Sequence, residues 1–243
     1  MDPFALPLIA QLLDAAYLLV ESIAALLHPL AGGASAAIAV VALTLLVRIL
    51  LIPVGISQVK AEWARRRLAP RLQALQRKYK KNPQLLQRKT MALYKAENVS
   101  PFAGILPTLL QAPVISIVYA LFIRGTIGGH ANALLASTIG GVPLGASLIT
   151  TGITWPGIAV FAALLIVIAV VAWISRRIAL RLALQPVDAP AAARLNSVLS
   201  WLPFVTLVFA AVVPLAATLY LATTATWTLV ERAILRRRHW GQV

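Results

Sequence analysis

A single arginine stands inside an otherwise apolar stretch of the sequence, "ALTLLVRILLIPVGI" at residues 42–56. Leucine, valine and isoleucine flank Arg48 on both sides, so the segment has the composition of a helix that crosses a lipid bilayer. An arginine at the centre of a bilayer costs about 2.5–3.5 kcal/mol on insertion scales. Such a charge needs a partner or water, which makes Arg48 the first candidate for a functional residue.

Further polar side chains interrupt the apolar stretches. Thr44 lies one helical turn before Arg48 and shares its face. A threonine or serine by itself is most often a packing residue that bonds to a carbonyl of its own helix. In combination with Arg48, these side chains predict a shared hydrophilic groove that holds water. The predicted groove residues are Arg48, Thr44, Gln111, Thr108, Thr224 and Tyr220.

The apolar stretches offer no obvious counter-charge for Arg48. Only Glu231 comes close, at the inner boundary of the last stretch. We therefore expect Arg48 to have no acid in reach and to depend on a water-filled cavity instead of an ion pair.

Covalent chemistry is not expected from this sequence. His28, His130 and His239 are scattered, and the chain has no cysteine. There is no HExxH or GxSxG motif and no phosphate-binding glycine loop followed by lysine. We predict that the protein is not an enzyme and that it has neither a cofactor nor a metal site.

The composition indicates an integral membrane protein. Of the 243 residues, 60% are hydrophobic, whereas soluble domains have about 45–50% apolar residues. The mean hydropathy is +0.85. The net charge is +15, but a protein that crosses the membrane repeatedly gathers its bases on the cytoplasmic side, so nucleic acid is not the expected partner.

The distribution of bases predicts the membrane topology. Residues 1–35 and 125–156 contain no lysine or arginine and are expected outside, whereas residues 57–100 and 176–197 are basic and are expected inside. The long apolar stretch after Arg194 is basic at both ends, which requires two crossings with a turn near Pro214. We predict an all-α membrane protein with five transmembrane helices, the N-terminus outside and the C-terminus in the cytoplasm.

The predicted segments follow from this topology. They are an extracytoplasmic interfacial amphipathic helix (1–33), a first span (34–56), a cytoplasmic basic hairpin (57–100), a second span (101–124), an extracytoplasmic loop (125–156), a third span (157–175), a cytoplasmic loop (176–197), a fourth span (198–213), a fifth span (214–231) and a basic cytoplasmic tail (232–243). The alternative for the first segment is a sixth span, although Asp14 and Glu21 argue against it.

The basic segment 57–100 has the pattern of two antiparallel helices. An apolar stripe runs from Leu68 to Tyr79, and "KKNPQ" then ends the first helix, because Asn82 can cap and Pro83 fits a first turn. The alternative is a solvated charged loop that only fixes topology. The predicted partner surface consists of Arg65, Arg66, Arg67, Arg71, Lys78, Lys80 and Lys81.

Three stretches together resemble a known family. They are "VALTLLVRILLIPVGISQ", "LAPRLQALQRKYKKNPQLLQRKTMALYKAENVSPFAGILPTLLQAPVISIVYALF" and "WLPFVTLVFAAVVPLAATLYLATTATWTLVERAILRRR". In order and spacing they are similar to the YidC-type membrane protein insertases, which include the mitochondrial Oxa and chloroplast Alb proteins. The resemblance implies a five-span core and a groove open to cytoplasm and lipid. It also implies that Arg48 and Gln111 match the groove arginine and glutamine of the family.

The chain departs from the family pattern in the last span. Thr224 stands among positions where the family has Trp and Asn, and Glu231 and Arg232 stand where it has Gln. The chain resembles the compact bacterial form or a minor paralogue, because no large outer domain precedes the first span.

The resemblance implies an insertase and chaperone of the bacterial plasma membrane. Its expected partners are membrane-protein clients with short acidic translocated tails, the lipid bilayer, and the ribosome and Sec translocase; no specific nucleic-acid sequence is expected. The alternatives are a small transporter or channel and a non-catalytic assembly subunit. A transporter is disfavoured, because the chain shows neither repeated halves nor acids within the spans.

Overall fold

The computed structural model describes residues 7–100, 106–151, 155–182 and 197–240. The described chain is mostly helical, as the sequence predicts. The long helices are α1 (Pro7–Ala31), α2 (Ser35–Leu50), α3 (Ile52–Lys78), α4 (Pro83–Ala96), α5 (Leu106–Ile123), α7 (Gly157–Leu182), α9 (Leu202–Val212) and α10 (Leu215–Trp240).

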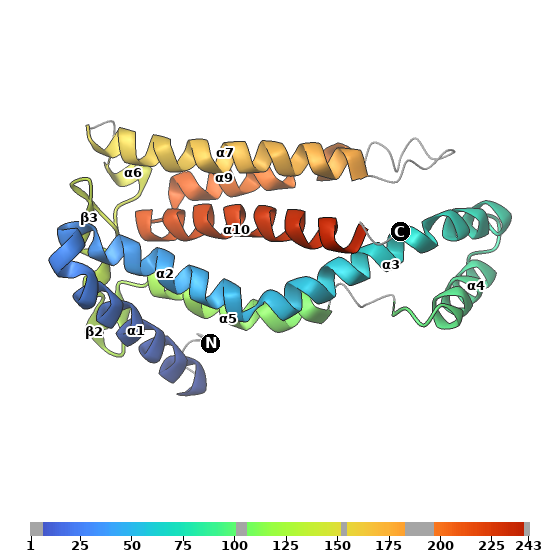
Figure 1. Cartoon of the computed structure of the whole chain (residues 1–243), viewed down its shortest axis with the longest axis horizontal. Coiled ribbons are helices and arrows are strands. Elements are labelled where there is room, and N and C mark those ends of the chain that lie inside the picture. Colours follow the sequence, from blue (N-terminus) through green and yellow to red (C-terminus); the bar gives the residue numbers. More distant parts are fainter. Residues whose placement is uncertain (1–6, 101–105, 152–154, 183–196, 241–243) are drawn as a thin grey trace.

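The helices form a bundle from which one hairpin projects. Helix α10 packs against α2 on one side and α7 on the other, and α9 packs against α7 (Figure 1). Helix α1 packs on α2 and α5. Two segments of the described residues are long and apolar enough to cross a membrane, Ile9–Leu50 and Gly157–Leu182.

The first predicted span, residues 34–56, is divided in the structure. Helix α2 ends at Leu50, Leu51 has φ −90° and ψ 0°, and α3 begins at Ile52. Pro53 lies in the first turn of α3 and has no backbone N–H, so it favours the start of a helix and not its interior. Arg48 therefore lies in the last turn of α2, just before this break.

The basic hairpin is confirmed as two helices. The Asn82 side chain caps α4 by accepting a hydrogen bond from the backbone N–H of Leu85 at 3.0 Å, and Pro83 occupies the first turn. Glu97, at the end of α4, pairs with Arg67 at 3.0 Å and with Arg71. Helix α4 therefore folds back beside α3 at the end remote from the bundle (Figure 1).

The loop between α5 and α7 contains two small β-hairpins that the sequence interpretation missed. Strands β1 (Thr126–Ile127) and β2 (His130–Ala131) pair, as do β3 (Thr138–Ile139) and β4 (Val142–Pro143). Gly-Gly forms each two-residue turn, with all four glycines at positive φ, as tight hairpin turns require. Two short helices, η3 (Ala133–Leu135) and α6 (Leu148–Thr151), complete the loop, and η2 (Gly32–Ala34) joins α1 to α2.

The predicted break at Pro214 is confirmed. Helix α9 ends at Val212, Val213 is extended with ψ 161°, and α10 begins at Leu215. The backbone N–H groups of Leu215 and Ala216 bond to the carbonyls of Ala146 and Leu144 in the loop, at 2.7 and 2.9 Å. The loop is thereby fixed to the start of α10.

The main hydrophobic core lies at this end of the bundle. The start of α10, the end of α5, the starts of α2 and α7, and the loop all contribute fully buried side chains. They include Leu215, Ala217, Leu121, Phe122, Ala39, Val40, Leu144 and Phe161. Asn132 closes the end of α5, because its side-chain amide donates hydrogen bonds to the carbonyls of Leu121 and Arg124 at 2.8 and 3.0 Å.

Candidate functional site

Arg48 borders a small cavity at the junction of α2 and α3. The cavity has a volume of about 30 Å³, which is enough for one or two water molecules. Its walls come from the break between the two helices and from the second half of α10. The lining residues are Arg48, Leu51, Gly55, Gln58, Thr228, Glu231, Arg232 and Leu235.

Glu231 lies in the same cavity as Arg48, which corrects the expectation that no acid is in reach. One carboxylate oxygen of Glu231 accepts a hydrogen bond from the indole Nε1 of Trp227 at 2.9 Å. The other oxygen is buried and has no hydrogen-bond partner in the part of the chain that the structure describes.

A glycine makes room for the Glu231 carboxylate. A Cβ atom added to Gly55 would collide with the buried carboxylate oxygen of Glu231. Helices α3 and α10 therefore approach each other where α3 has no side chain. The cavity is thus lined by two arginines, Arg48 and Arg232, and by one carboxylate whose position depends on Gly55.

Two predicted groove residues, Thr44 and Tyr220, are buried in the packing of the bundle. Thr44 is buried, and its hydroxyl donates to the carbonyl of Val40 at 2.7 Å, as a helix-packing threonine does. Tyr220 is buried beside Phe122, with ring centroids 6.0 Å apart. Neither side chain lines the Arg48 cavity.

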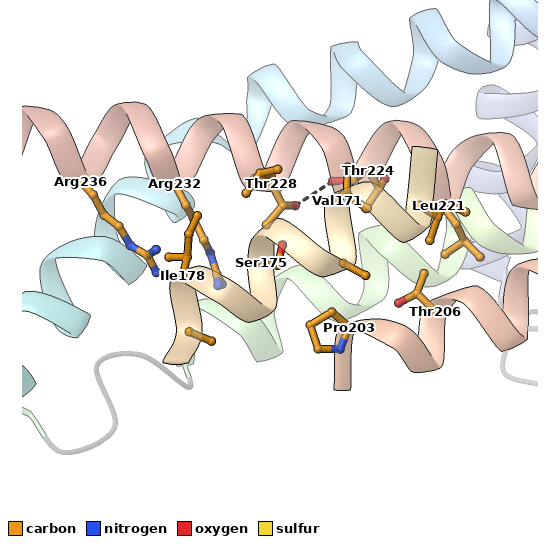
Figure 2. A pocket seen from close by; sticks show the side chains of 15 residues that line it. Val171, Ser175, Ile178, Pro203, Thr206, Leu221, Thr224, Thr228, Arg232 and Arg236 are labelled. Atoms are coloured by element: carbon orange, nitrogen blue, oxygen red, sulfur yellow. Dashed lines mark hydrogen bonds between the residues drawn. The ribbon is translucent and has the colours of Figure 1, made fainter. Parts of the chain in front are cut away.

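Thr224 lines a different cavity, which lies between α7, α9 and α10 (Figure 2). Its hydroxyl oxygen is buried and has no hydrogen-bond partner within the described ranges. The two cavities meet at Thr228 and Arg232, which line both. Arg48 and Thr224 therefore line two separate cavities, and both cavities border α10.

The side chains of the remaining two groove candidates lie outside what the structure describes. Thr108 and Gln111 belong to α5 by their backbone, but the structure does not describe their side chains. Their place in a groove stays a prediction.

The sequence interpretation did not place Gly55 or Trp227 near Arg48, and it named Glu231 only as a boundary residue out of reach of Arg48. Spacing along α10 offered a signal, because Trp227 and Glu231 are four residues apart and share a face. The neighbourhood of Gly55 and Glu231 had no such signal, because it depends on how α3 and α10 pack.

The bases of the hairpin are of two kinds. Arg66 pairs with Glu62 of the same helix at 2.9 Å, and Arg65 is half-buried and also has an interaction partner. Arg67 and Arg71 pair with Glu97 and so join the two helices of the hairpin. Lys78, Lys80 and Lys81 are exposed at its tip. Within the described residues, no group of three or more histidines or carboxylates lies close enough to hold a metal ion.

Residues 26–241 match the family model described as 60Kd inner membrane protein. The chain belongs to this family. The resemblance to the YidC type is thereby confirmed. The family and the apolar helices together indicate a bacterial inner membrane protein.

Curated relatives of the family support the same assignment. A protein of Clostridium perfringens named "Membrane protein insertase YidC" is 41% identical over 90 residues, which cover 37% of this chain and 38% of the relative. The protein of the same name in Clostridium tetani is 37% identical over 93 residues, covering 37% and 42%. "Membrane protein insertase YidC 1" of Halalkalibacterium halodurans is 38% identical over 98 residues, covering 39% and 38%. The chain spans about two fifths of the length of these relatives.

Proposed function

We propose that the protein is a membrane protein insertase and chaperone of the bacterial plasma membrane. The observation that carries the proposal is the Arg48 cavity, in a chain that belongs to a family whose curated relatives are named insertases. Insertion makes and breaks no covalent bond, so the protein acts by lowering the barrier for a client segment to leave water. Its site needs a charge and a hydrated path, not a nucleophile.

The proposed mechanism places the acidic tail of a client next to Arg48. A carboxylate loses most of its hydration when it enters hydrocarbon, and a positive charge part-way across offsets some of that cost. Glu231 in the same cavity weakens the field of Arg48, so the tail is attracted and is also released. The groove that we propose extends to Thr108 and Gln111.

The proposed arrangement in the membrane has five spans, with the N-terminus outside and the C-terminus in the cytoplasm. The fourth span is the shortest, because the eleven residues of α9 rise only about 16 Å against a hydrocarbon core of about 30 Å. A thinned bilayer at this helix would shorten the path of a client's tail. Helix α1 lies in the outer interface in this arrangement, and the hairpin faces the cytoplasm.

A direct experiment tests the proposed function. The full chain is reconstituted in liposomes with one small single-span client that carries a short acidic N-terminal tail, and insertion is scored by protection of the tail from added protease. We expect protection above that of empty liposomes. Equal protection in both would contradict insertase activity and favour an assembly role.

The hairpin tip is proposed to contact the ribosome, the Sec translocase or the client. The sequence alone favours charge reversal at Arg65, Arg66 and Arg67 as a test, but Arg66 and Arg67 pair within the chain. Lys78, Lys80 and Lys81 are the sharper choice, because they are exposed at the tip. We expect their joint replacement by glutamate to lower insertion about threefold or more at low salt, and less at high salt, since exposed charges are screened.

The matched control has the same charge change on α4. Arg88, Lys89 and Lys95 are equally exposed, and their replacement by glutamate is expected to have a smaller effect. Insertion measured at two salt concentrations compares the variants. An equal effect of both triple variants would mean that the tip has no specific contact and that only the total basic charge of the hairpin matters.

A further inference from the structure

The cavity between α7, α9 and α10 has a volume of about 390 Å³ and is not needed for the role of Arg48 (Figure 2). All three helices contribute to its wall. Its lining includes the apolar residues Ile168, Val171 and Leu221, the polar residue Ser175 and the basic residues Arg232 and Arg236. Volumes of this size are typical of small-ligand sites.

The polarity of the cavity changes from one end to the other. Val171 and Leu221 lie toward one end, together with Thr206 and Thr224 (Figure 2). Arg232 and Arg236 lie at the other end with Ile178 beside Arg232, and Ser175 lies between the two ends. A ligand that matches this wall has an apolar tail and an anionic head.

The two arginines keep donor capacity for such a head. One terminal nitrogen of Arg236 bonds to both carboxylate oxygens of Glu62, at 3.0 and 3.1 Å, which holds its guanidinium in place. Its Nε is buried and has no hydrogen-bond partner among the residues that the structure describes. Arg232 is exposed at the end of the cavity. The basic end therefore has one donor held by an ion pair and one exposed donor.

Aromatic residues near the same end of α7 mark the depth of the lipid headgroups. Trp173 and Trp201 are 46% and 50% exposed. Arg177 stacks over Trp173 at 4.9 Å from the ring centroid, and Arg176 stacks over Trp201 at 4.1 Å. Exposed tryptophan with arginine is typical of the interface between hydrocarbon and water. The basic end of the cavity is thus at the level where phospholipid phosphates lie.

We propose that this cavity binds one anionic phospholipid. Its phosphate lies between Arg232 and Arg236, and the upper part of one acyl chain lies along Val171, Ile168 and Leu221. Basic pockets between transmembrane helices on the cytoplasmic side select anionic lipids in this way. The lipid would hold the second half of α10 in place, and that half also forms part of the wall of the Arg48 cavity.

Lipid binding is measured on the full purified chain. The protein is incubated in mixed vesicles of phosphatidylglycerol and phosphatidylcholine, extracted in mild detergent, and its bound lipids are counted by native mass spectrometry. We expect one retained phosphatidylglycerol. Replacing both Arg232 and Arg236 by glutamine should lower its retention about thirtyfold, since each base near the membrane surface contributes about a sixfold preference.

Two further variants separate the site from general charge and from misfolding. Arg237→Gln with Arg238→Gln makes the same charge change at exposed positions of α10 that do not line the cavity, and should leave retention unchanged. Ala225→Phe fills the cavity without changing charge and should lower retention. Thermal unfolding of each variant in detergent shows whether it is folded.

The alternatives give different results. Displacement of the lipid by millimolar inorganic phosphate would show a phosphate site and overturn the lipid proposal. Displacement by a soluble acidic client peptide would assign the cavity to the client. Equal loss in the Arg237 and Arg238 variant would mean that the lipid only follows surface charge. Insertion is not part of the readout, so this inference and the proposed function fail independently.

Discussion

Replacement of Arg48 by alanine is expected to lower the insertion of an acidic-tailed client about tenfold, and that of a neutral-tailed client much less. The cavity then keeps only Arg232 beside the Glu231 carboxylate, so the acidic tail no longer meets a site with net positive charge. Tenfold corresponds to about 1.4 kcal/mol, well within the range for two charges a few ångströms apart near a protein surface. Insertion of the two clients into liposomes, measured side by side, gives the ratio.

The nature of the substituent at position 48 tests whether charge is what matters. Lysine supplies the same charge on a flexible stem, so Arg48→Lys should retain most of the activity, whereas Arg48→Glu should be worse than alanine. The fold should survive each change, because Thr44 and Tyr220 pack without a hydrogen bond to Arg48. An alanine variant that unfolds would assign Arg48 a structural role.

Replacement of Glu231 by glutamine is expected to have the opposite effect. Glutamine keeps an oxygen that accepts the Trp227 hydrogen bond but removes the negative charge from the Arg48 cavity. The field of Arg48 is then less compensated, and binding of an acidic tail should tighten about fivefold, equivalent to about 1 kcal/mol. Crosslinking yield between the protein and a client peptide with a photoreactive tail measures this.

The combination of both changes is the control. In the Arg48→Ala background, Glu231→Gln should recover part of the lost binding, because it removes the residual negative charge. A Glu231→Gln effect that is the same for acidic and neutral tails would contradict an electrostatic role for this carboxylate. It would point instead to packing against Gly55.

Local sequence rules predicted the ends of several helices. The cap by Asn82 and the break at Pro214 follow from backbone chemistry that each residue carries with it, and the structure has both. The two Gly-Gly turns between α5 and α7 carried an equally local signal, since Gly128–Gly129 and Gly140–Gly141 each follow Thr-Ile. Their strands have only two residues each, too few for a visible alternation of polar and apolar positions.

The composition of the Arg48 cavity could not be predicted, for a physical reason. Glu231 approaches Arg48 because α3 and α10 pack closely at Gly55, and such a register is decided by complementary surfaces of two helices far apart in the sequence. Periodicity within one helix gives the face of a residue but not its neighbour on another helix. The same limit explains why Thr224 lines the cavity toward α7 and α9 and not the one with Arg48.

The most direct test of a hydrated site at Arg48 is the reactivity of a single thiol placed there. The chain has no cysteine, so Arg48→Cys carries the only thiol, and a membrane-impermeant charged reagent can be applied from either side of a vesicle. Val40→Cys, at a fully buried position, and Ala131→Cys, at an exposed position of β2, are the controls. We predict that the Arg48→Cys thiol reacts from the cytoplasmic side only, that the Ala131→Cys thiol reacts from the opposite side only, and that the Val40→Cys thiol reacts from neither. A thiol at position 48 that stays unreactive from both sides would contradict a hydrated site at Arg48.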